Sequence, residues 1–198
     1  MKSRAVFLDR DGTISEEVGY LDDPSRFRLL PGSPAAIQLL NENGWKVVVV
    51  TNQSGVARGF FAEEMVVQVN ELMRSKLAAA GARLDGVYYC PHHPTSGAAP
   101  YVSDCDCRKP KPGLLFQAAQ ELDIDLSASW MVGDRYGDVA VAPAAGVRSA
   151  LVLTGYGRDE WEALGRVWKH EPELVAEDLL EVARKIVGKK AKQEFNRR

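Results

Sequence analysis

Two acidic residues near the start of the chain stand one residue apart, where an apolar run meets a glycine. They are Asp9 and Asp11, which follow Ala5–Leu8 and precede Gly12. If the run is a buried strand, Asp9 lies at its carboxyl end, the edge of an α/β sheet at which ligands bind. Strand alternation turns both side chains to the same side. Because paired carboxylates repel unless a cation joins them, and oxygen ligands suit Mg²⁺, the spacing indicates phosphoryl-transfer chemistry at a magnesium site.

Three later segments carry groups that complement these acids. Small hydrogen-bonding residues from Thr51 to Gly55 follow the apolar run Lys46–Val50 and could hold phosphate oxygens. The segment Arg108–Gly113 puts cations at the start of a predicted helix, whose free N–H groups also attract an anion. Asp134 and Asp138 then put acids after another apolar strand. A purely structural chain has no reason to collect this set, so the joint pattern indicates a phosphate-processing site.

A second cluster joins all three cysteines of the chain to a histidine within one short segment. Cys90 and His92 stand two residues apart, as do Cys105 and Cys107. Such a soft four-ligand set is typical of a closed tetrahedral Zn²⁺ site, which has no open position for catalysis. An odd number of cysteines also argues against a disulfide framework. We therefore predict a structural zinc ion, for which His93 could replace His92.

The elements that must position these groups follow from the pattern of apolar residues. Short β-branched runs alternate with amphipathic segments, which predicts an α/β fold in three layers, a Rossmann-like parallel sheet with helices on both faces. The predicted strands are Ala5–Leu8, Lys46–Val50, Gly86–Tyr89, Trp130–Val132 and Ser149–Leu153. The predicted helices are Ser33 to Gly44, Ala62 to Ala80, Gly113 to Leu122, Tyr136 to Ala145 and Leu174 to Val187. The helical spacing of apolar residues in the second of these segments predicts that it packs on the sheet, and we assign it no chemical role.

Length and charge limit the class of protein. The 198 residues fit one domain, which we expect over residues 1–188, followed by a disordered basic tail at 189–198. A formal net charge of -2 disfavours nucleic-acid binding and favours a small-molecule substrate. The longest apolar run, Val47–Val50, is too short to cross a bilayer, and no signal-type segment stands at the start. We therefore expect a cytoplasmic protein without membrane contact.

The segments around Asp9, Thr51, Lys109 and Asp134 resemble the four motifs of the haloacid dehalogenase superfamily of phosphatases. The resemblance covers most of the chain. It implies that Asp9 is a nucleophile that attacks phosphorus to give an aspartyl phosphate, which water then hydrolyses. It implies that Asp11 is the general acid for the leaving oxygen and then the base that activates water. Thr51 and Lys109 are implied to stabilise the phosphoryl oxygens.

The same resemblance implies a catalytic metal ion. Mg²⁺ would be held by Asp9, Asp134 and the backbone carbonyl of Asp11, and would neutralise charge as the phosphoryl group moves. The role of Asp138 stays open, because the second acid of this motif in relatives ligates the metal, acts through water or pairs with the lysine, here Lys109. Two metals are therefore expected, Mg²⁺ for catalysis and Zn²⁺ for structure.

The residues around the predicted zinc site narrow the resemblance. Tyr89–Pro94 and Cys105–Pro110 resemble the heptose bisphosphate phosphatases and the related histidinol-phosphate phosphatases. In the heptose enzymes the zinc loop and the loop after the first motif flank the sugar in place of a separate cap domain, so a monomer is adequate. Arg108 is implied to grip the phosphate left on the sugar, because a guanidinium fork suits a bidentate contact. The residues implied to bind substrate are Arg10, Glu17, Val18, Gly19, Tyr20, Asn52, Gln53, Ser54, Arg108 and Arg135.

The resemblance implies a Mg²⁺-dependent phosphatase that removes the 7-phosphate of D-glycero-D-manno-heptose 1,7-bisphosphate, in the synthesis of nucleotide-activated heptose for lipopolysaccharide. A histidinol-phosphate phosphatase of histidine biosynthesis is the alternative enzyme. A non-catalytic, zinc-organised binding module is the alternative from another class, and the intact set Asp9, Asp11, Thr51, Lys109 and Asp134 argues against it. A polynucleotide end phosphatase would need a basic groove, which the net charge disfavours.

Overall fold

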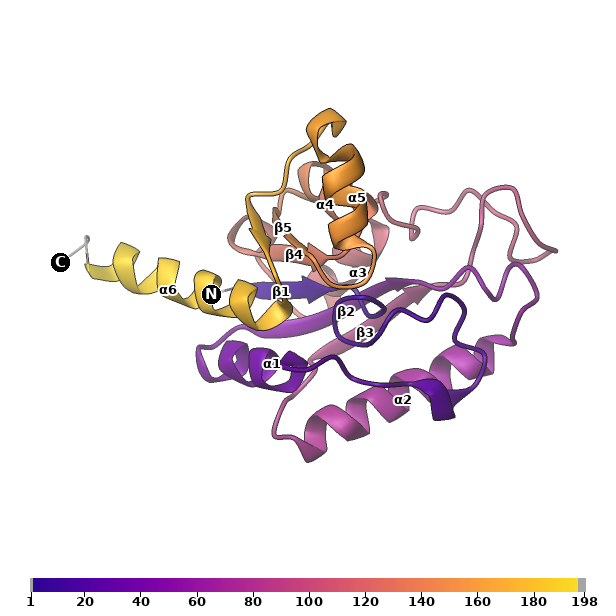
Figure 1. Ribbon diagram of the computed structural model, residues 1–198, viewed down its shortest axis with the longest axis horizontal. Coiled ribbons are helices and arrows are strands. Elements are labelled where there is room, and N and C mark those ends of the chain that lie inside the picture. Colours follow the sequence, from indigo (N-terminus) through magenta and orange to yellow (C-terminus); the bar gives the residue numbers. More distant parts are fainter. Residues whose placement is uncertain (1, 196–198) are drawn as a thin grey trace.

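A six-stranded parallel sheet with helices on both faces forms the framework of the molecule (Figure 1). The computed structural model describes residues 2–195, and their side chains up to Gly188. The strands are β1 (Ala5–Leu8), β2 (Lys46–Asn52), β3 (Gly86–Cys90), β4 (Trp130–Gly133), β5 (Arg148–Val152) and β6 (Leu174–Ala176). The helices are α1 (Ser33–Glu42), α2 (Glu63–Ala79), α3 (Gly113–Glu121), α4 (Tyr136–Ala145), α5 (Gly157–Leu164) and α6 (Leu179–Phe195). Short 3₁₀ turns lie at Pro24–Arg26, Leu126–Ala128 and Gly165–Val167.

Each face of the sheet has its own hydrophobic core. Val6 and Leu8 of β1 pack on one side with buried residues of α1, α2 and α6. Ala5 and Phe7 of the same strand pack on the other side with residues of α3 and α4. This burial on both faces explains why the central strands are continuous apolar runs in the sequence. The strand ends are therefore held rigidly at the edge of the sheet.

The order of the strands creates a crevice beside β1. The order is β3-β2-β1-β4-β5-β6, so the direction of chain progression reverses between β1 and β4. In open α/β sheets ligands bind at this place, outside the carboxyl ends of the strands. Leu8 pairs with Val132 in the parallel register. Asp9, which follows β1, and Asp134, which follows β4, therefore reach the same crevice although they are far apart in the sequence.

The predicted fold class and the five predicted strands are confirmed. One predicted helix needs a correction, and one helix was not predicted. Residues 174–187 are not a single helix, because Leu174–Ala176 form β6 beside β5 and the helix begins only at Leu179. A strand of three residues is too short to show an alternation, so its apolar residues merge with the helical pattern after it. The helix α5 had no counterpart in the prediction.

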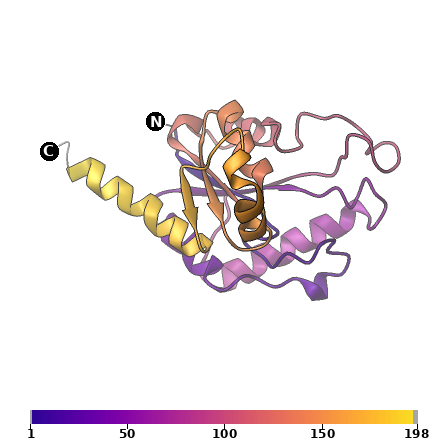
Figure 2. The ribbon, with the colours of Figure 1, turned by 45° about the horizontal axis from the view of Figure 1, so that its top comes forward.

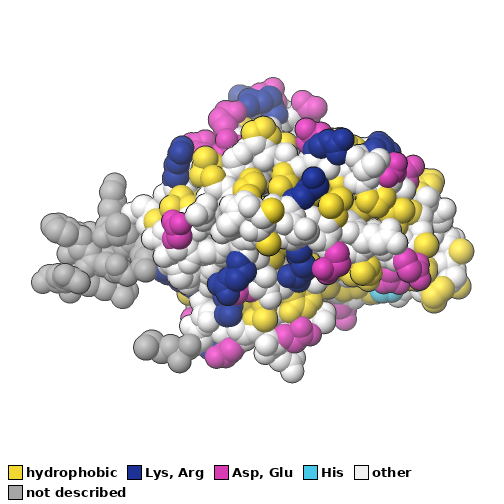
Figure 3. All heavy atoms as spheres, turned by 90° about the horizontal axis from the view of Figure 1, so that it is seen from below, with side chains coloured by type: hydrophobic (Ala, Val, Ile, Leu, Met, Phe, Trp, Pro, Cys, Tyr) yellow, Lys and Arg dark blue, Asp and Glu magenta, His cyan; other side chains and the backbone are white. Residues whose placement is uncertain are grey.

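The last helix bears on the predicted tail. α6 continues to Phe195 and so includes the first part of residues 189–198, while 196–198 lie outside the described residues. Figure 2 shows this helix projecting from the end of the sheet. Within residues 2–195 no helix has the length and apolarity needed to span a membrane. On the face that carries α1 and α2, acidic and basic side chains are interspersed (Figure 3).

Candidate active site

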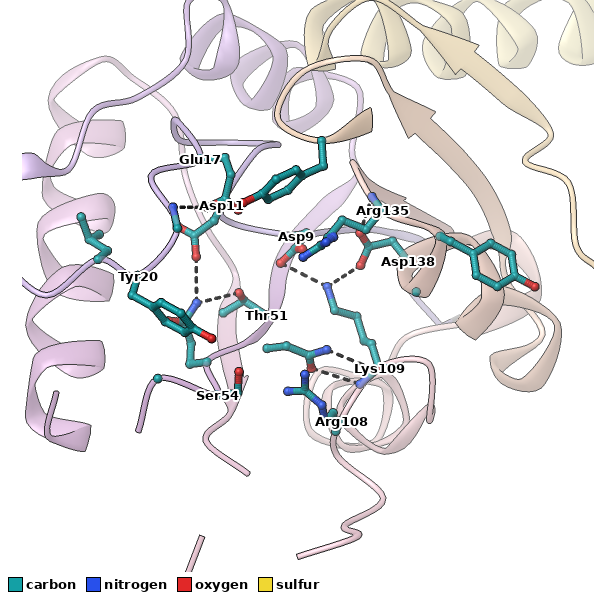
Figure 4. Close-up of a pocket in the computed structure, with 18 of the residues that line it drawn as sticks. Asp9, Asp11, Glu17, Tyr20, Thr51, Ser54, Arg108, Lys109, Arg135 and Asp138 are labelled. Carbon is teal, nitrogen blue, oxygen red and sulfur yellow. Dashed lines mark hydrogen bonds and ion pairs between the residues drawn. The ribbon is translucent and has the colours of Figure 1, made fainter. Parts of the chain in front are cut away.

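A cavity of about 410 Å³ lies at the carboxyl ends of β1, β2 and β4 (Figure 4). Its walls are the segments that follow these strands, the start of the segment 108–113, and the loop residues Glu17, Gly19, Tyr20 and Leu21. Asp9, Asp11, Thr51 and Lys109, the four predicted catalytic residues, all line it. The topology thus brings these residues together at the predicted edge of the sheet.

Lys109 stands between two acids at the base of the cavity. Its Nζ lies 3.1 Å from Asp9 Oδ1 and 2.6 Å from Asp138 Oδ1, and its side chain is almost fully buried. The other oxygen of Asp138, Oδ2, accepts the backbone N–H of Arg135 at 3.1 Å, in a capping box at the start of α4. Both oxygens of Asp138 therefore have partners, and the residue fixes Lys109 by pairing.

Asp134 is fully buried beside this group. Its Oδ2 accepts the backbone N–H of Tyr156 at 2.9 Å, while Oδ1 has no hydrogen-bond partner among the described residues. Gly12 and Gly155 pack against the carboxylate so closely that a Cβ atom would lie 2.1 Å and 2.2 Å from Asp134 Oδ2, respectively. Only glycine fits at these two positions, because any side chain would collide with the Asp134 carboxylate. A buried carboxylate oxygen left without a donor fits a cation as its partner.

Burial and neighbouring charges shift the pKa values of these groups. Burial, opposed by Lys109 and reinforced by Asp138, raises the pKa of Asp9 to about 6. Burial and the charges of Asp9 and Asp138 raise the pKa of Asp134 to about 8. Burial alone would lower the pKa of Lys109, but Asp138 and Asp9 outweigh it and raise that pKa. One lysine does not balance three carboxylates, so the site favours a bound cation.

The same three acids could hold a metal ion. Asp9, Asp134 and Asp138 each offer an oxygen, and these oxygens lie within 4.8 Å of one another. Carboxylate oxygens are the ligands that Mg²⁺ prefers. Since Asp138 is committed to Lys109 and to a backbone N–H, Asp9 and Asp134 are the carboxylates that fit a magnesium ion best.

Asp11 is held at the rim of the cavity by several donors. Arg10 donates from Nε to Asp11 Oδ1 at 3.0 Å and from Nη2 to Oδ2 at 2.8 Å. Gln53 donates from Nε2 to Asp11 Oδ2 at 2.9 Å and to the hydroxyl oxygen of Thr51 at 3.0 Å. The Arg10 side chain is 1% exposed and lies behind Asp11 rather than on the cavity wall. Arg10 was predicted to contact substrate, but here its guanidinium contacts Asp11 and does not line the cavity.

Most of the other predicted substrate contacts reach the cavity. Its wall includes Glu17, Gly19, Tyr20, Asn52, Gln53, Ser54, Arg108 and Arg135. Val18 is the exception, since it packs against the hydrophobic core under α1 and α2. Asn52 ties two walls together, because it exchanges hydrogen bonds of 3.1 Å with the backbone of Lys109. Burial raises the pKa of Glu17.

Several residues of the wall were not predicted. They are Leu21, Gly55, Phe61, Tyr136, Gly137, Asp138, Tyr156 and Glu160. Asp138 was recognised as an acid of the motif but not assigned to the site. Glu160 accepts from Arg135 Nε at 3.0 Å, and the Arg135 guanidinium lies 4.4 Å from the centroid of the Tyr156 ring. Tyr156 and Glu160 come from the unpredicted region around α5, where no motif marked them.

The predicted zinc ligands converge at the end of β3. The Sγ atoms of Cys90 and Cys105 are 3.5 Å apart, and those of Cys105 and Cys107 are 3.0 Å apart. His92 Nδ1 lies 3.4 Å from Cys107 Sγ, and one ligand atom from each of the four residues lies within 4.8 Å of the others. His93 is turned away, since its Nδ1 accepts a backbone N–H at 2.9 Å. The donor set fits a tetrahedral Zn²⁺ ion with His92 as the fourth ligand.

Comparisons with known proteins give the family. The HAD-hydrolase-like family matches residues 106–182. The D-glycero-beta-D-manno-heptose-1,7-bisphosphate 7-phosphatase of Pasteurella multocida (strain Pm70) is 43% identical over 189 residues, which is 95% of this chain and 99% of that protein. The protein of the same name from Escherichia coli (strain K12) is 47% identical over 152 residues, 76% of this chain and 80% of that protein.

Solved structures agree with these relatives. The crystal structure of D,D-heptose 1,7-bisphosphate phosphatase from B. bronchiseptica, complexed with magnesium and phosphate, superposes with a TM-score of 0.82 and 35% identity, and covers 94% of this chain and 99% of that chain. The enzyme from Burkholderia thailandensis gives a TM-score of 0.67 and 32% identity, and covers 93% of this chain and 98% of that chain. The chain therefore belongs to the heptose bisphosphate phosphatase family of the HAD-like hydrolases.

Proposed function

We propose that this chain is a Mg²⁺-dependent phosphatase that removes the 7-phosphate of D-glycero-D-manno-heptose 1,7-bisphosphate. The observation that carries the proposal is the cluster of Asp9, Lys109, Asp138 and Asp134 at one strand edge, in a chain that matches a heptose bisphosphate phosphatase over 99% of that protein's length. A sugar bisphosphate also fits a cavity with acids and a lysine at its base and Arg108 on its wall.

The Asp9 carboxylate is the proposed nucleophile. Its Oδ1 accepts the backbone N–H of Arg10 at 2.8 Å and faces Lys109 Nζ, so the plane of the carboxylate is fixed before substrate binds. Attack on phosphorus forms the bond from Asp9 to phosphorus and breaks the bond from phosphorus to the sugar oxygen. Lys109 and the Thr51 hydroxyl lie on the cavity wall, where they stabilise the phosphoryl oxygens.

Asp11 is the proposed general acid and base. It holds a proton on a carboxyl oxygen and gives it to the departing sugar oxygen in the first step. In the second step it takes a proton from water, whose oxygen attacks phosphorus and releases Asp9 and inorganic phosphate. Such proton transfer typically raises the rate of an enzymatic reaction by about 10²- to 10⁴-fold.

Asp9, Asp134 and the backbone carbonyl of Asp11 would hold magnesium, which when bound would supply positive charge to offset that of the phosphoryl group. The buried Asp134 oxygen without a partner supports this assignment. Asp138 acts through Lys109, which it holds against Asp9.

The zinc cluster is proposed to be structural. The loop that carries Arg108 and Lys109 follows Cys107 directly, and Arg108 Nη1 donates to the backbone oxygen of His92 at 3.2 Å. Zinc held by these four residues would order the loop that carries Arg108 and Lys109. Arg108 then grips the phosphate that remains on the sugar. Three reduced cysteines suit the cytoplasm, where we propose that the chain works as a monomer.

A substrate panel tests the proposal. The purified protein is assayed with Mg²⁺ on heptose 1,7-bisphosphate, a heptose monophosphate and histidinol phosphate, and its zinc content is measured by elemental analysis. We expect kcat/KM to be highest for the bisphosphate and zinc to be present in equimolar amount. Higher kcat/KM on histidinol phosphate would contradict the proposed substrate and leave the phosphatase chemistry in place.

A further inference from the structure

A buried cation behind the cavity links the proposed acid and base to a helix outside the site. The Arg10 guanidinium is 1% exposed and grips both oxygens of Asp11, at 3.0 Å and 2.8 Å. Its third nitrogen, Nη1, donates to Asn70 Oδ1 at 3.0 Å. The guanidinium is therefore held from two sides, by the carboxyl that it orients and by an amide oxygen of α2.

Asn70 is an unexpected residue at its position. The inner face of α2 is otherwise apolar, with Val66, Val69, Met73 and Leu77 buried against the sheet. Asn70 stands among them at 5% exposure. A buried amide weakens a hydrophobic face unless it makes a hydrogen bond, and here the partner is the guanidinium of Arg10.

We propose that Asn70 is a positioning residue for the reaction, which fixes Arg10 and through it the Asp11 carboxyl. The proposal rests on the role of Asp11 in the proposed function. With its outer nitrogen anchored on Asn70, the guanidinium cannot rotate away, so its two other donors define the plane of the carboxyl. Gln53 adds a donor to Asp11 Oδ2 at 2.9 Å from the opposite loop.

The clamp has different consequences for the two half-reactions. The charged carboxylate that activates water accepts both bonds of the Arg10 fork. In the protonated acid of the first step the hydroxyl oxygen is a weaker acceptor, so the position of the acid depends more on where the guanidinium is anchored. Loss of the Asn70 anchor therefore harms protonation of the leaving oxygen most, and a misplacement of about 1 Å is enough to cost up to 10²-fold in rate.

Two substrates with different leaving groups separate this role from packing. kcat/KM reports the steps up to transfer of the phosphoryl group to Asp9. A sugar alkoxide needs a proton from Asp11 to leave, whereas the nitrophenolate of p-nitrophenyl phosphate leaves without one. The variants are Asn70→Leu, which removes the acceptor at similar volume, Asn70→Asp, which keeps it, and Arg10→Lys, which keeps the charge without the fork. Met73→Leu, on the same helix face, is the packing control.

We expect Asn70→Leu and Arg10→Lys to lower kcat/KM on heptose bisphosphate about 10-fold or more, and on p-nitrophenyl phosphate less than about 2-fold. Asn70→Asp should keep most of the wild-type ratio of kcat/KM on the two substrates, and Met73→Leu should leave that ratio unchanged. An equal loss on both substrates, or no loss in a folded Asn70→Leu variant, would overturn the proposal. If Asn70→Leu does not fold, the ratio for Arg10→Lys and Asn70→Asp decides. If the wild type prefers another alkyl phosphate, the same ratio is measured on that ester, so the two proposals fail separately.

Discussion

The two candidate metal sites of this chain are built in opposite ways. The acidic site takes Asp9 and Asp134 from neighbouring strands that are far apart in the sequence, and both are buried. The sulfur site takes its ligands from two short segments, 90–92 and 105–107, and only Cys90 among them is fully buried. The acidic site lies at the edge of the sheet, and the sulfur site lies within a loop.

The difference shows which site depends on its metal for structure. None of the residues from His92 to Arg108 is fully buried, so this loop has little apolar surface of its own to hold it. The strands that present the acids are fully buried on both faces. We therefore expect loss of magnesium to stop catalysis without disturbing the fold, and loss of zinc to loosen the loop that carries Arg108 and Lys109.

The largest expected effect is on the acidic site. Asp9→Asn removes the attacking carboxylate but keeps the shape of the side chain, so kcat should fall by at least about 10³-fold while the fold is retained. Steady-state assays and circular dichroism measure both. Asp22→Asn, at an exposed acid, is the matched control and should keep full activity. Full Mg²⁺-dependent activity in Asp9→Asn would show that the nucleophile is another residue.

Substitution of two neighbouring histidines tests which of them belongs to the sulfur site. His92→Ala should lose zinc and destabilise the protein by several kcal/mol, because metal binding is coupled to ordering of the loop. His93→Ala should keep its zinc, since His93 points away from the cluster. Elemental analysis and thermal unfolding measure the two outcomes. Zinc loss in His93→Ala alone would reverse the ligand assignment.

Arg108 connects the sulfur site to the acidic site, and its substitution should have a smaller effect on activity. Arg108→Ala should lower kcat/KM on the bisphosphate by about 10- to 100-fold, as expected when a hydrogen bond to a charged group worth about 1.5 to 3 kcal/mol is lost. On the sugar monophosphate the change should stay below about threefold, since the remote phosphate is missing. Arg58→Ala, at an exposed arginine after β2 whose Nη2 lies 3.0 Å from His93 Nε2, is the control. Equal losses on both substrates would contradict a remote grip.

The last expected effect is on stability rather than on activity, and it depends on pH. In the metal-free protein the pKa of Asp134 rises from 3.8 to about 8, chiefly through burial. The folded state then binds more protons than the unfolded state between these values, so stability should fall as pH rises from 4 to 8, by roughly 1 kcal/mol per pH unit. Magnesium should reduce this slope, as should Asp134→Asn, which leaves only the smaller rise in the pKa of Asp9. Thermal unfolding with EDTA or Mg²⁺ measures it, and a slope unchanged by Asp134→Asn would contradict the assignment.

The sequence predicts the strands, and the candidate ligands that the structure brings together, where local patterns mark them. Asp9, Lys109 and Asp134 follow strands or precede helices with strong signals, and parallel topology alone brings them together. The two short Cys-x-[His/Cys] segments likewise carry their spacing in the sequence. These predictions rest on residue type and on position at a strand end, which are properties that a sequence shows directly.

The parts that were missed depend on contacts between distant residues. Asn70 lies in a helix whose spacing predicts only packing, and its bond to Arg10 appears only when α2 is laid on the sheet. Tyr156 and Glu160 reach the cavity because β5 adjoins β4, although nothing in their segment resembles a motif. The ion pair of Asp138 with Lys109 at 2.6 Å, which is one of the three roles that the motif allows, also cannot be read from spacing.

Trapping the covalent intermediate tests the central claim most directly. The enzyme is mixed with Mg²⁺ and substrate, quenched in acid during turnover and reduced with borohydride, which converts an aspartyl phosphate to homoserine. Peptide mass spectrometry should then find homoserine at position 9 and nowhere else, and none in Asp9→Asn. Homoserine at another acidic residue, or an unmodified position 9 in an enzyme trapped during turnover, would contradict the account.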